Sequence, residues 1–331
     1  MLAQLDSDLS RWKEIKKAGG VTPRSGRELD DIFSVRSPLS FPRKYMRSGP
    51  GLQGLPGGLN LPRRIQWSRQ CSGEGKHILR TLTRRIKPAP LQPGARSDAA
   101  GKAVRNIILL SLPDEEYDLL RPHLEPADLP QHQILHEPGE KLEFTYFLNE
   151  GMTSLVALSG DGRSVEVGIV GKEGMVGMSL TVGLRREVFR AILQMAGSGV
   201  RIRSRVFQAI LPCAPVLRSE LSRFALMQGM QVAQLAACNR LHETEQRLVR
   251  WLLMCQDRVD SKLLPLTHEF LAQMLGTGRP SVSLAAAVLE DAGLIENLRG
   301  MVKILNRKSL EAAACECYGV IQHLNGGLGL K

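Results

Sequence analysis

Residues 264–305 carry the pattern that most restricts how this chain can fold. Thr267 is a suitable N-cap residue for a first helix. Gly276 follows where a tight turn requires a positive φ, and a second helix begins near Arg279 with Pro280 in its first turn, where a missing N–H is tolerated. Two short helices joined by a glycine turn are typical of a helix-turn-helix.

The residues around this turn support the same interpretation. Ala272 is a small residue where the two helices would cross, and Val282 is a branched residue for their shared core. Residues 294–305 then predict two short strands about a turn at Arg299-Gly300, which would be the wing of a winged helix.

The positions of single basic residues matter more in this module than its net charge. From Leu263 onward the chain holds six basic and six acidic residues, so bulk charge does not explain an affinity for DNA. Arg279 begins the second helix, the element that enters the major groove in such domains. Four basic residues in and just after the wing suit phosphate contacts: Arg299, Lys303, Arg307 and Lys308.

Strand-length segments separated by glycine occupy the middle of the chain. They are residues 129–137, 144–150, 152–159, 164–171, 188–197 and 198–211. This spacing favours an antiparallel roll or barrel. In the central segment, Val165, Val167 and Ile169 alternate with Ser164, Glu166 and Gly168, which predicts a half-buried strand. Two short helices, broken at Pro113 and Pro122, are expected before the roll.

A long helix is expected after the roll. Apolar residues recur at helical spacing from Leu217 to Cys238, which predicts about 23 residues spanning about 35 Å. A polar break at Asn239–Glu245 separates it from a second helix over residues 243–259. The apolar stripe suits either packing on its own domain or the seam of a dimer.

Residues 1–100 differ from the rest of the chain. They hold 19 basic and 8 acidic residues and nine of the eighteen prolines, and we expect a disordered leader. It could be an arm that strengthens nucleic-acid binding, a segment with no role, or an extension from a wrongly chosen start codon. The chain shows no membrane-spanning run and no secretory signal, and its six scattered cysteines indicate a reduced, cytoplasmic protein.

Several segments resemble one family. They are HEPGE (136–140), RSVEVGIVGKEGMVG (163–177), FRAILQ (189–194), RLVRWLLMCQDRV (247–259), the module 264–305 and LEAAACECYG (310–319). In this order, from about residue 105 to 318, they resemble the Crp/Fnr family of bacterial transcription regulators. The resemblance implies an α+β protein: an antiparallel, cyclic-nucleotide-binding-like β-roll (jelly roll), a long dimerisation helix and a C-terminal winged helix.

The resemblance also implies a domain organisation and partners. After the leader (1–100) come a β-roll sensor domain (105–212), a dimerisation helix and hinge (213–260) and a winged helix-turn-helix DNA-binding domain (261–331). The expected partners are double-stranded DNA with a palindromic site, a second copy of the chain, an unknown small-molecule effector and RNA polymerase, with no membrane.

The resemblance places the family's base-reading positions on the second helix of this module. Arg279 matches its guanine-reading arginine. Pro280 and Leu284 stand where cyclic-AMP-responsive members have a glutamate and a second arginine, so the half-site should differ from theirs. The candidate DNA-binding residues are Thr277, Arg279, Ser281, Ser283, Arg299 and Lys303.

The residues that form the family's effector pocket are matched less completely in this sequence. Its candidate residues are Gly174, Gly177, Arg190 and Ala191, of which Arg190-Ala191 matches the family's phosphate-holding pair. Met178 replaces the ribose-holding glutamate, and Val232-Ala233 stands where polar residues would touch a purine. The sequence therefore does not favour a cyclic nucleotide, and no cofactor is evident. Because only Cys71 precedes Cys213, an Fnr-type iron–sulfur sensor is not expected.

No catalytic constellation and no metal site are predicted, so the chain is not expected to be an enzyme. Along a strand, His132 and His136 would lie about 13 Å apart, too far to chelate one ion. Cys315 and Cys317 do not share a helix face and are only a weak redox or metal candidate. A roll-type metalloenzyme would need clustered histidines that these strands do not supply. The alternative function is a small-ligand receptor whose winged helix docks a protein instead of DNA.

Overall fold

The computed structural model describes residues 96–327, and our expectations for residues 1–95 lie outside this range. Residues 96–100, which the sequence assigned to the leader, pack against the first helices. Tyr117 donates a hydrogen bond to the carbonyl of Ser97 at 2.9 Å, and the guanidinium of Arg96 lies 4.5 Å from the centre of the Tyr117 ring. The last residues of the predicted leader, from Arg96 on, therefore contact the body of the protein.

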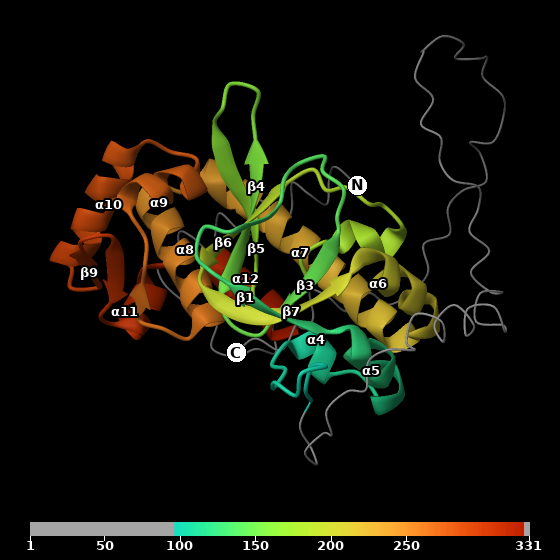
Figure 1. Ribbon diagram of the computed structural model, residues 1–331. Helices are drawn as coiled ribbons and strands as arrows, with labels where there is room; N and C mark the ends of the chain where they lie inside the picture. The colour runs from blue at the N-terminus through green and yellow to red at the C-terminus, as the bar shows by residue number, and fades with distance from the viewer. Residues whose placement is uncertain (1–95, 328–331) are drawn as a thin grey trace, which may run out of the picture. The chain divides into compact units, whose positions relative to one another are not determined.

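Two antiparallel sheets form the roll (Figure 1). One has the strand order β1 (Glu125–Leu129), β7 (Gly197–Arg203), β3 (Phe144–Leu148), and the other β2 (Ile134–His136), β6 (Arg190–Met195), β4 (Met152–Leu158), β5 (Ser164–Val170). Short helices flank them: α4 (Ile107–Leu110), α5 (Asp114–Leu120), η1 (Arg121–His123), η2 (Met178–Val182), α6 (Ser204–Ile210) and η3 (Leu211–Cys213). Phe147 of the first sheet and Leu193 of the second belong to one buried core, so the sheets pack on each other.

The structure corrects two predicted strands. The segment 198–211 is a strand only to Arg203, after which α6 begins. Phe207 and Ile210 are buried three residues apart, a spacing that a helix places on one face. The segment 129–137 is divided between the end of β1 and the separate strand β2.

The long helix α7 (Pro215–Leu241) has 27 residues and is longer than expected. The predicted polar break is reduced to two residues, because Glu243 caps α8 (Thr244–Val259) in a capping box with Gln246. The side of α7 that faces its own domain is formed by Leu217, Leu221, Phe224, Gln231, Leu235 and Cys238. In the described part of the chain, no helix is both long and apolar enough to cross a bilayer.

The remaining elements form a second core. They are β8 (Leu263–Leu264), α9 (His268–Leu275), α10 (Arg279–Asp291), β9 (Ile295–Leu298), β10 (Met301–Ile304), α11 (Arg307–Ala313) and α12 (Glu316–Gly327). The strands pair antiparallel in the order β8-β10-β9. Trp251 and Leu252 of α8 belong to this core, and α12 packs against both α7 and α8. The C-terminal helix therefore joins the long helix to the helix-turn-helix.

Candidate DNA-binding interface and effector cavity

The helix-turn-helix has the local geometry that its sequence predicts. The Thr267 side chain accepts a hydrogen bond from the Phe270 amide at 3.2 Å and caps α9. Gly276 ends this helix with a φ of 59°. Ala272 and Val282 are both buried where α9 and α10 meet. These contacts fix the angle between the two helices.

The first turn of α10 presents its outer face to solvent. Arg279 is the first residue of the helix, and its side chain is 68% exposed and 3.9 Å from the Glu269 carboxylate. Ser281 and Leu284 are also exposed. Because an exposed ion pair at this distance holds Arg279 only weakly, its guanidinium is available to a base edge.

Ser283 has a different environment from Ser281. Its hydroxyl lies 3.1 Å from Nδ1 of His268, whose Nε2 lies 3.3 Å from the Asn297 side-chain oxygen. Ser283 thereby links α9, α10 and the wing, which makes it a positioning residue in this structure. Thr277 is half-buried in the turn between the helices.

The wing keeps two of the expected basic residues on its surface. Arg299 lies exposed at the turn between β9 and β10, and Lys303 pairs with Glu296 on the neighbouring strand at 2.8 Å. Arg307 does not join them. It forms ion pairs with Asp257 at 2.6 Å and Glu311 at 2.8 Å, so it ties α11 to α8. Our expectation of a phosphate contact from Arg307 is therefore not supported by its placement.

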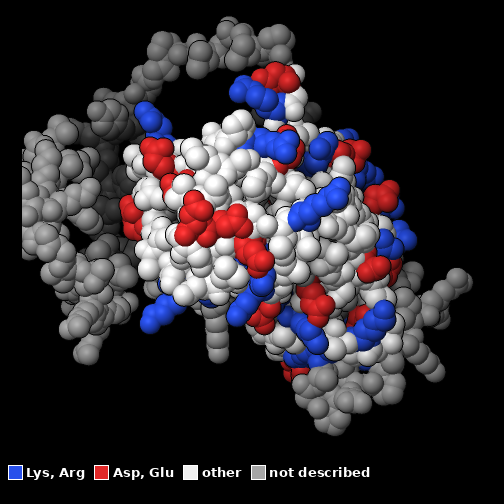
Figure 2. All heavy atoms as spheres, turned by 90° about the vertical axis from the view of Figure 1, so that its left-hand side faces the viewer, with Lys and Arg blue, Asp and Glu red and all other residues white. Residues whose placement is uncertain are grey.

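Charges of both signs are interspersed on the side of the molecule that carries the helix-turn-helix. Figure 2 shows this face with blue and red patches separated by uncharged surface. This agrees with the equal numbers of acidic and basic residues in the module. The affinity of this module for DNA would have to come from individual side chains such as Arg279 and Arg299.

The first turn of α10 also faces the hairpin between β4 and β5. The two border a groove of about 1040 Å³ lined by Leu158, Arg163, Val165, Gln273, Thr277 and Arg279, among others. The Gln273 side chain donates a hydrogen bond to the Ser164 hydroxyl. The roll therefore contacts the helix-turn-helix beside the residues predicted to read DNA.

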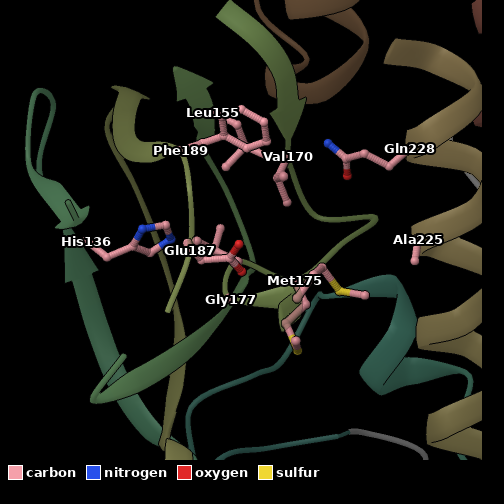
Figure 3. Close-up of a pocket in the computed structure, with 11 residues that line it drawn as sticks. His136, Leu155, Val170, Met175, Gly177, Glu187, Phe189, Ala225 and Gln228 are labelled. Atoms are coloured by element: carbon pink, nitrogen blue, oxygen red, sulfur yellow. The ribbon is translucent and has the colours of Figure 1, made fainter. Parts of the chain in front are cut away.

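A smaller cavity, of about 200 Å³, lies between the roll and α7 (Figure 3). Its wall is largely apolar and includes Leu155, Val170, Met175, Met178 and Phe189. His136, Glu187 and Gln228 are the polar side chains among its lining residues. Burial lowers the pKa of His136, which favours a neutral imidazole.

Of the four candidate effector residues, only Gly177 lines this cavity. Arg190 pairs with Glu137 at 2.8 Å, and Ala191 is fully buried in β6. Gly174 serves packing, because a Cβ at this position would lie 2.2 Å from the Phe224 ring of α7. The structure thus separates residues that the resemblance placed in one pocket.

Glu166 lies on the covered face of β5, which the alternation pattern did not predict. The sequence suggested that Val165 and Val167 would face inward, but Glu166 and Gly168 are buried and these two valines are half-buried. The Glu166 carboxylate accepts a 2.7 Å hydrogen bond from Trp251 of α8 and another from Ser154. Burial raises the pKa of Glu166 to about 7. Trp251 thereby joins α8 to the roll.

Comparisons with known proteins identify the C-terminal module. Residues 246–313 match a family described as the Crp-like helix-turn-helix domain. A search among curated proteins finds no match.

Solved structures extend the likeness beyond this module. A transcriptional regulator of the Crp/Fnr family from Eubacterium rectale, itself described as putative, is 18% identical, with a TM-score of 0.51 over 61% of this chain and 94% of its own. A CRP-family transcriptional regulator from Thermus thermophilus is 22% identical (TM-score 0.48; 57% and 96% covered), and FixK2 from Bradyrhizobium japonicum is 15% identical (TM-score 0.49; 58% and 98%).

The match to the first of these structures concerns the fold, and it covers nearly all of that protein. It agrees with the α+β class and with the order of roll, long helix and winged helix read from the sequence. The first of these structures is described as a transcriptional regulator of the Crp/Fnr family. The chain thus has the fold of the Crp/Fnr transcription regulators, with a Crp-like helix-turn-helix domain at residues 246–313.

Proposed function

We propose that this protein is a homodimeric transcription regulator of the Crp/Fnr type that binds specific DNA sequences in the cytoplasm. The observation that carries the proposal is the complete winged helix-turn-helix with Arg279 exposed at the first turn of α10. A guanidinium at this position can form a bidentate contact with a guanine. Arg299 and Lys303 on the wing would contact phosphates.

The outer face of α7 supports a dimer. Leu226 is 63% exposed and Met230 is 40% exposed, and they are one helical turn apart. The surface around them consists mostly of small or apolar residues: Ala225, Gly229, Val232, Ala233, Ala236, Ala237 and Leu241. Small residues allow two helix backbones to approach closely. A second copy of α7 would cover this face and place two copies of α10 about a two-fold axis.

The cavity of Figure 3 is our candidate effector site. Its volume of about 200 Å³ and its apolar wall suit a small, largely apolar molecule that one of the three polar lining residues could orient. No lysine or arginine lies among its lining residues, which argues against a cyclic nucleotide phosphate there. Because Ala225 and Gln228 of α7 border the cavity, a bound molecule would act directly on the dimerisation helix. RNA polymerase as a further partner stays a prediction.

The experiment that tests this function is selection of random duplex DNA by the purified full chain, followed by sequencing of the bound fraction. We expect a two-fold symmetric motif with half-sites one helical turn apart, roughly 34 Å. Binding that is indifferent to polyanions and to salt would instead favour the alternative, in which the winged helix docks a protein.

A further inference from the structure

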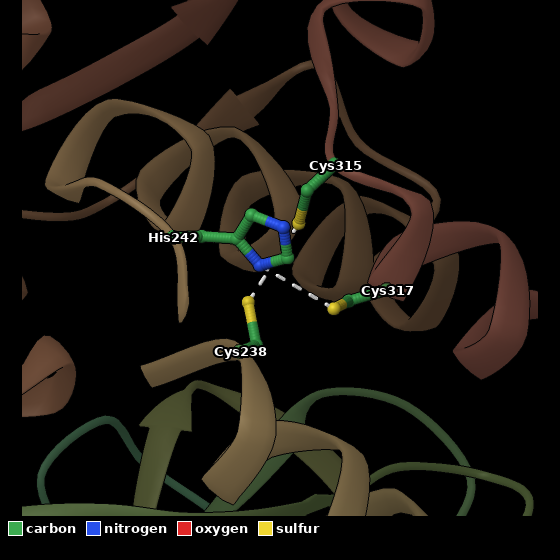
Figure 4. Close-up of side chains that lie close together, drawn as sticks. All are labelled: Cys238, His242, Cys315 and Cys317. Carbon is green, nitrogen blue, oxygen red and sulfur yellow. Dashed lines mark hydrogen bonds between the residues drawn. The ribbon is translucent and has the colours of Figure 1, made fainter. Parts of the chain in front are cut away.

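Four metal-ligating side chains converge at the C-terminal end of α7 (Figure 4). Cys238 and His242 lie one helical turn apart at this end. Cys315 and Cys317 come from the loop after α11 and the first turn of α12. Each side chain offers one ligand atom, and all four atoms lie within 4.8 Å of one another. The sequence made Cys315 and Cys317 only a weak redox or metal candidate, because residues two positions apart on a helix do not share a face. In the structure, the partners of these thiols come from α7.

The separations between these atoms suit a single tetrahedral ion. The Sγ atoms of Cys238 and Cys315 are 3.6 Å apart, and Sγ of Cys317 is 3.6 Å from Nδ1 of His242. Zinc binds thiolate sulfur at about 2.3 Å and imidazole nitrogen at about 2.0–2.1 Å, so a tetrahedral site has S···S edges of about 3.8 Å and S···N edges of about 3.5 Å. The four side chains therefore need little movement to enclose an ion.

The surrounding residues complete such a site. The second ring nitrogen of His242, Nε2, lies 3.3 Å from the Glu316 carboxylate, an arrangement that orients metal-bound histidines. Gln234 of α7 donates a hydrogen bond to Sγ of Cys317 at 3.1 Å. Cys238, Cys315 and Cys317 form a small buried cluster of their own. The ligands are thus held in place and shielded from solvent.

The charge of the ligand set matters because a buried cation lies in the same region of the core. Three thiolates and a neutral imidazole around a divalent ion carry a net charge of −1. Arg250 of α8 is buried, and its Nε and Nη1 have no hydrogen-bond partner. Arg250 lies within electrostatic range of Cys238. An anionic metal complex beside Arg250 would offset the cost of burying this guanidinium.

We propose that Cys238, His242, Cys315 and Cys317 bind one zinc ion in a closed structural site. Four protein ligands leave no open position for a substrate, which distinguishes it from a catalytic zinc centre. His242 stands in the two-residue connection between α7 and α8, and Cys317 stands at the start of α12. The ion would hold the end of the dimerisation helix, the hinge and the C-terminal helix in one arrangement.

Metal analysis of the reduced full chain tests this proposal without reference to DNA, so its failure is separate from that of the proposed function. After passage over a chelating resin, we expect one zinc per chain. Replacement of zinc by cobalt should give the visible absorption of tetrahedral Co²⁺ and a thiolate-to-metal band in the near ultraviolet. A reduced chain that holds no zinc and gives no such cobalt spectrum would overturn the proposal.

Two variants locate the ion. Cys315→Ser should lose most of the zinc, whereas Cys255→Ala, which alters a buried cysteine outside the cluster, should retain it. Retention of stoichiometric zinc in Cys315→Ser would contradict the assignment, as would iron with inorganic sulfide in the wild type. If Cys238 and Cys315 form a disulfide and the reduced protein binds no metal, the zinc proposal is wrong and these two residues are a thiol pair instead. The cobalt spectrum of the wild type tests the zinc proposal even if Cys315→Ser does not fold.

Discussion

Glu173 and Arg258 form an ion pair of 2.8 Å in which each side chain is only 1% exposed. Glu173 follows β5 of the roll and also accepts a hydrogen bond from the Gly171 amide, while Arg258 stands in the last turn of α8 and donates to the Met254 carbonyl. Asn325 of α12 lies 3.5 Å from the same guanidinium and accepts a 2.6 Å hydrogen bond from Gln231 of α7. Charged and polar groups from four parts of the fold therefore meet in the interior.

Arg258→Met should destabilise the protein by about 3–5 kcal/mol, because it leaves the buried Glu173 carboxylate without its charged partner. Equilibrium unfolding in urea measures this loss. The double variant Glu173→Leu/Arg258→Met should recover most of it, since no unpaired charge remains. Equal losses in the single and double variants would show that packing, and not charge, dominates here.

The stability of the protein should fall as the pH rises toward 7 because of Glu166. Burial raises the pKa of this carboxyl from its ordinary 4.5 to about 7, so the folded state binds the proton more tightly than the unfolded state. The protonated Glu166 contributes its full share to the free energy of unfolding below about pH 4.5. This share is lost as the pH rises through 7, a change of about 3 kcal/mol. Glu166→Gln should remove this slope in unfolding measurements between pH 5 and 8; parallel profiles for the two proteins would contradict it.

Arg279 and Lys303 should contribute to DNA binding in different ways. Arg279→Ala should cost about 1–3 kcal/mol on the selected site and little on random duplex, since it removes a base contact. Lys303→Ala should weaken both about equally and reduce the salt dependence, since it removes a phosphate contact. Titrations of both duplexes at several salt concentrations separate the two effects. An equal loss on both duplexes for Arg279→Ala would refute its base-reading role.

Leu226→Glu should dissociate the dimer by placing a charge in the apolar seam of α7. Sedimentation velocity over a range of concentrations measures the change. Leu184→Glu is the matched control, because Leu184 is 61% exposed against 63% for Leu226 but lies outside α7. We expect the control to remain dimeric. Dissociation in both variants, or in neither, would place the seam elsewhere.

Gly174→Ala should destabilise the packing of α7 on the roll by about 1–3 kcal/mol, because the added methyl group would overlap the Phe224 ring. Gly319→Ala is the control. An added Cβ there meets no atom within 4 Å, and alanine should stabilise α12 by about 0.5–1 kcal/mol. Thermal unfolding of both variants should therefore shift in opposite directions.

The sequence by itself determined the features that depend on near neighbours. The Thr267 cap, the turn at Gly276 and the strands of the wing all follow from residues a few positions apart, and the structure contains each of them. The length of α7 was less predictable, because Glu243 and Gln246 restart the helix almost at once through a capping box. A polar run such as Asn239–Glu245 favours a break but does not set its length.

Only the tertiary structure decided which distant side chains meet. Arg190 forms an ion pair with Glu137, 53 residues away, and does not line the cavity of Figure 3. Glu166 is buried because Trp251, 85 residues later, supplies a hydrogen bond that offsets its desolvation. Cys238 meets Cys315 across 77 residues because α12 packs back on α7. Periodicity along the chain reports which face of an element is apolar, whereas the partner that covers this face depends on packing between elements.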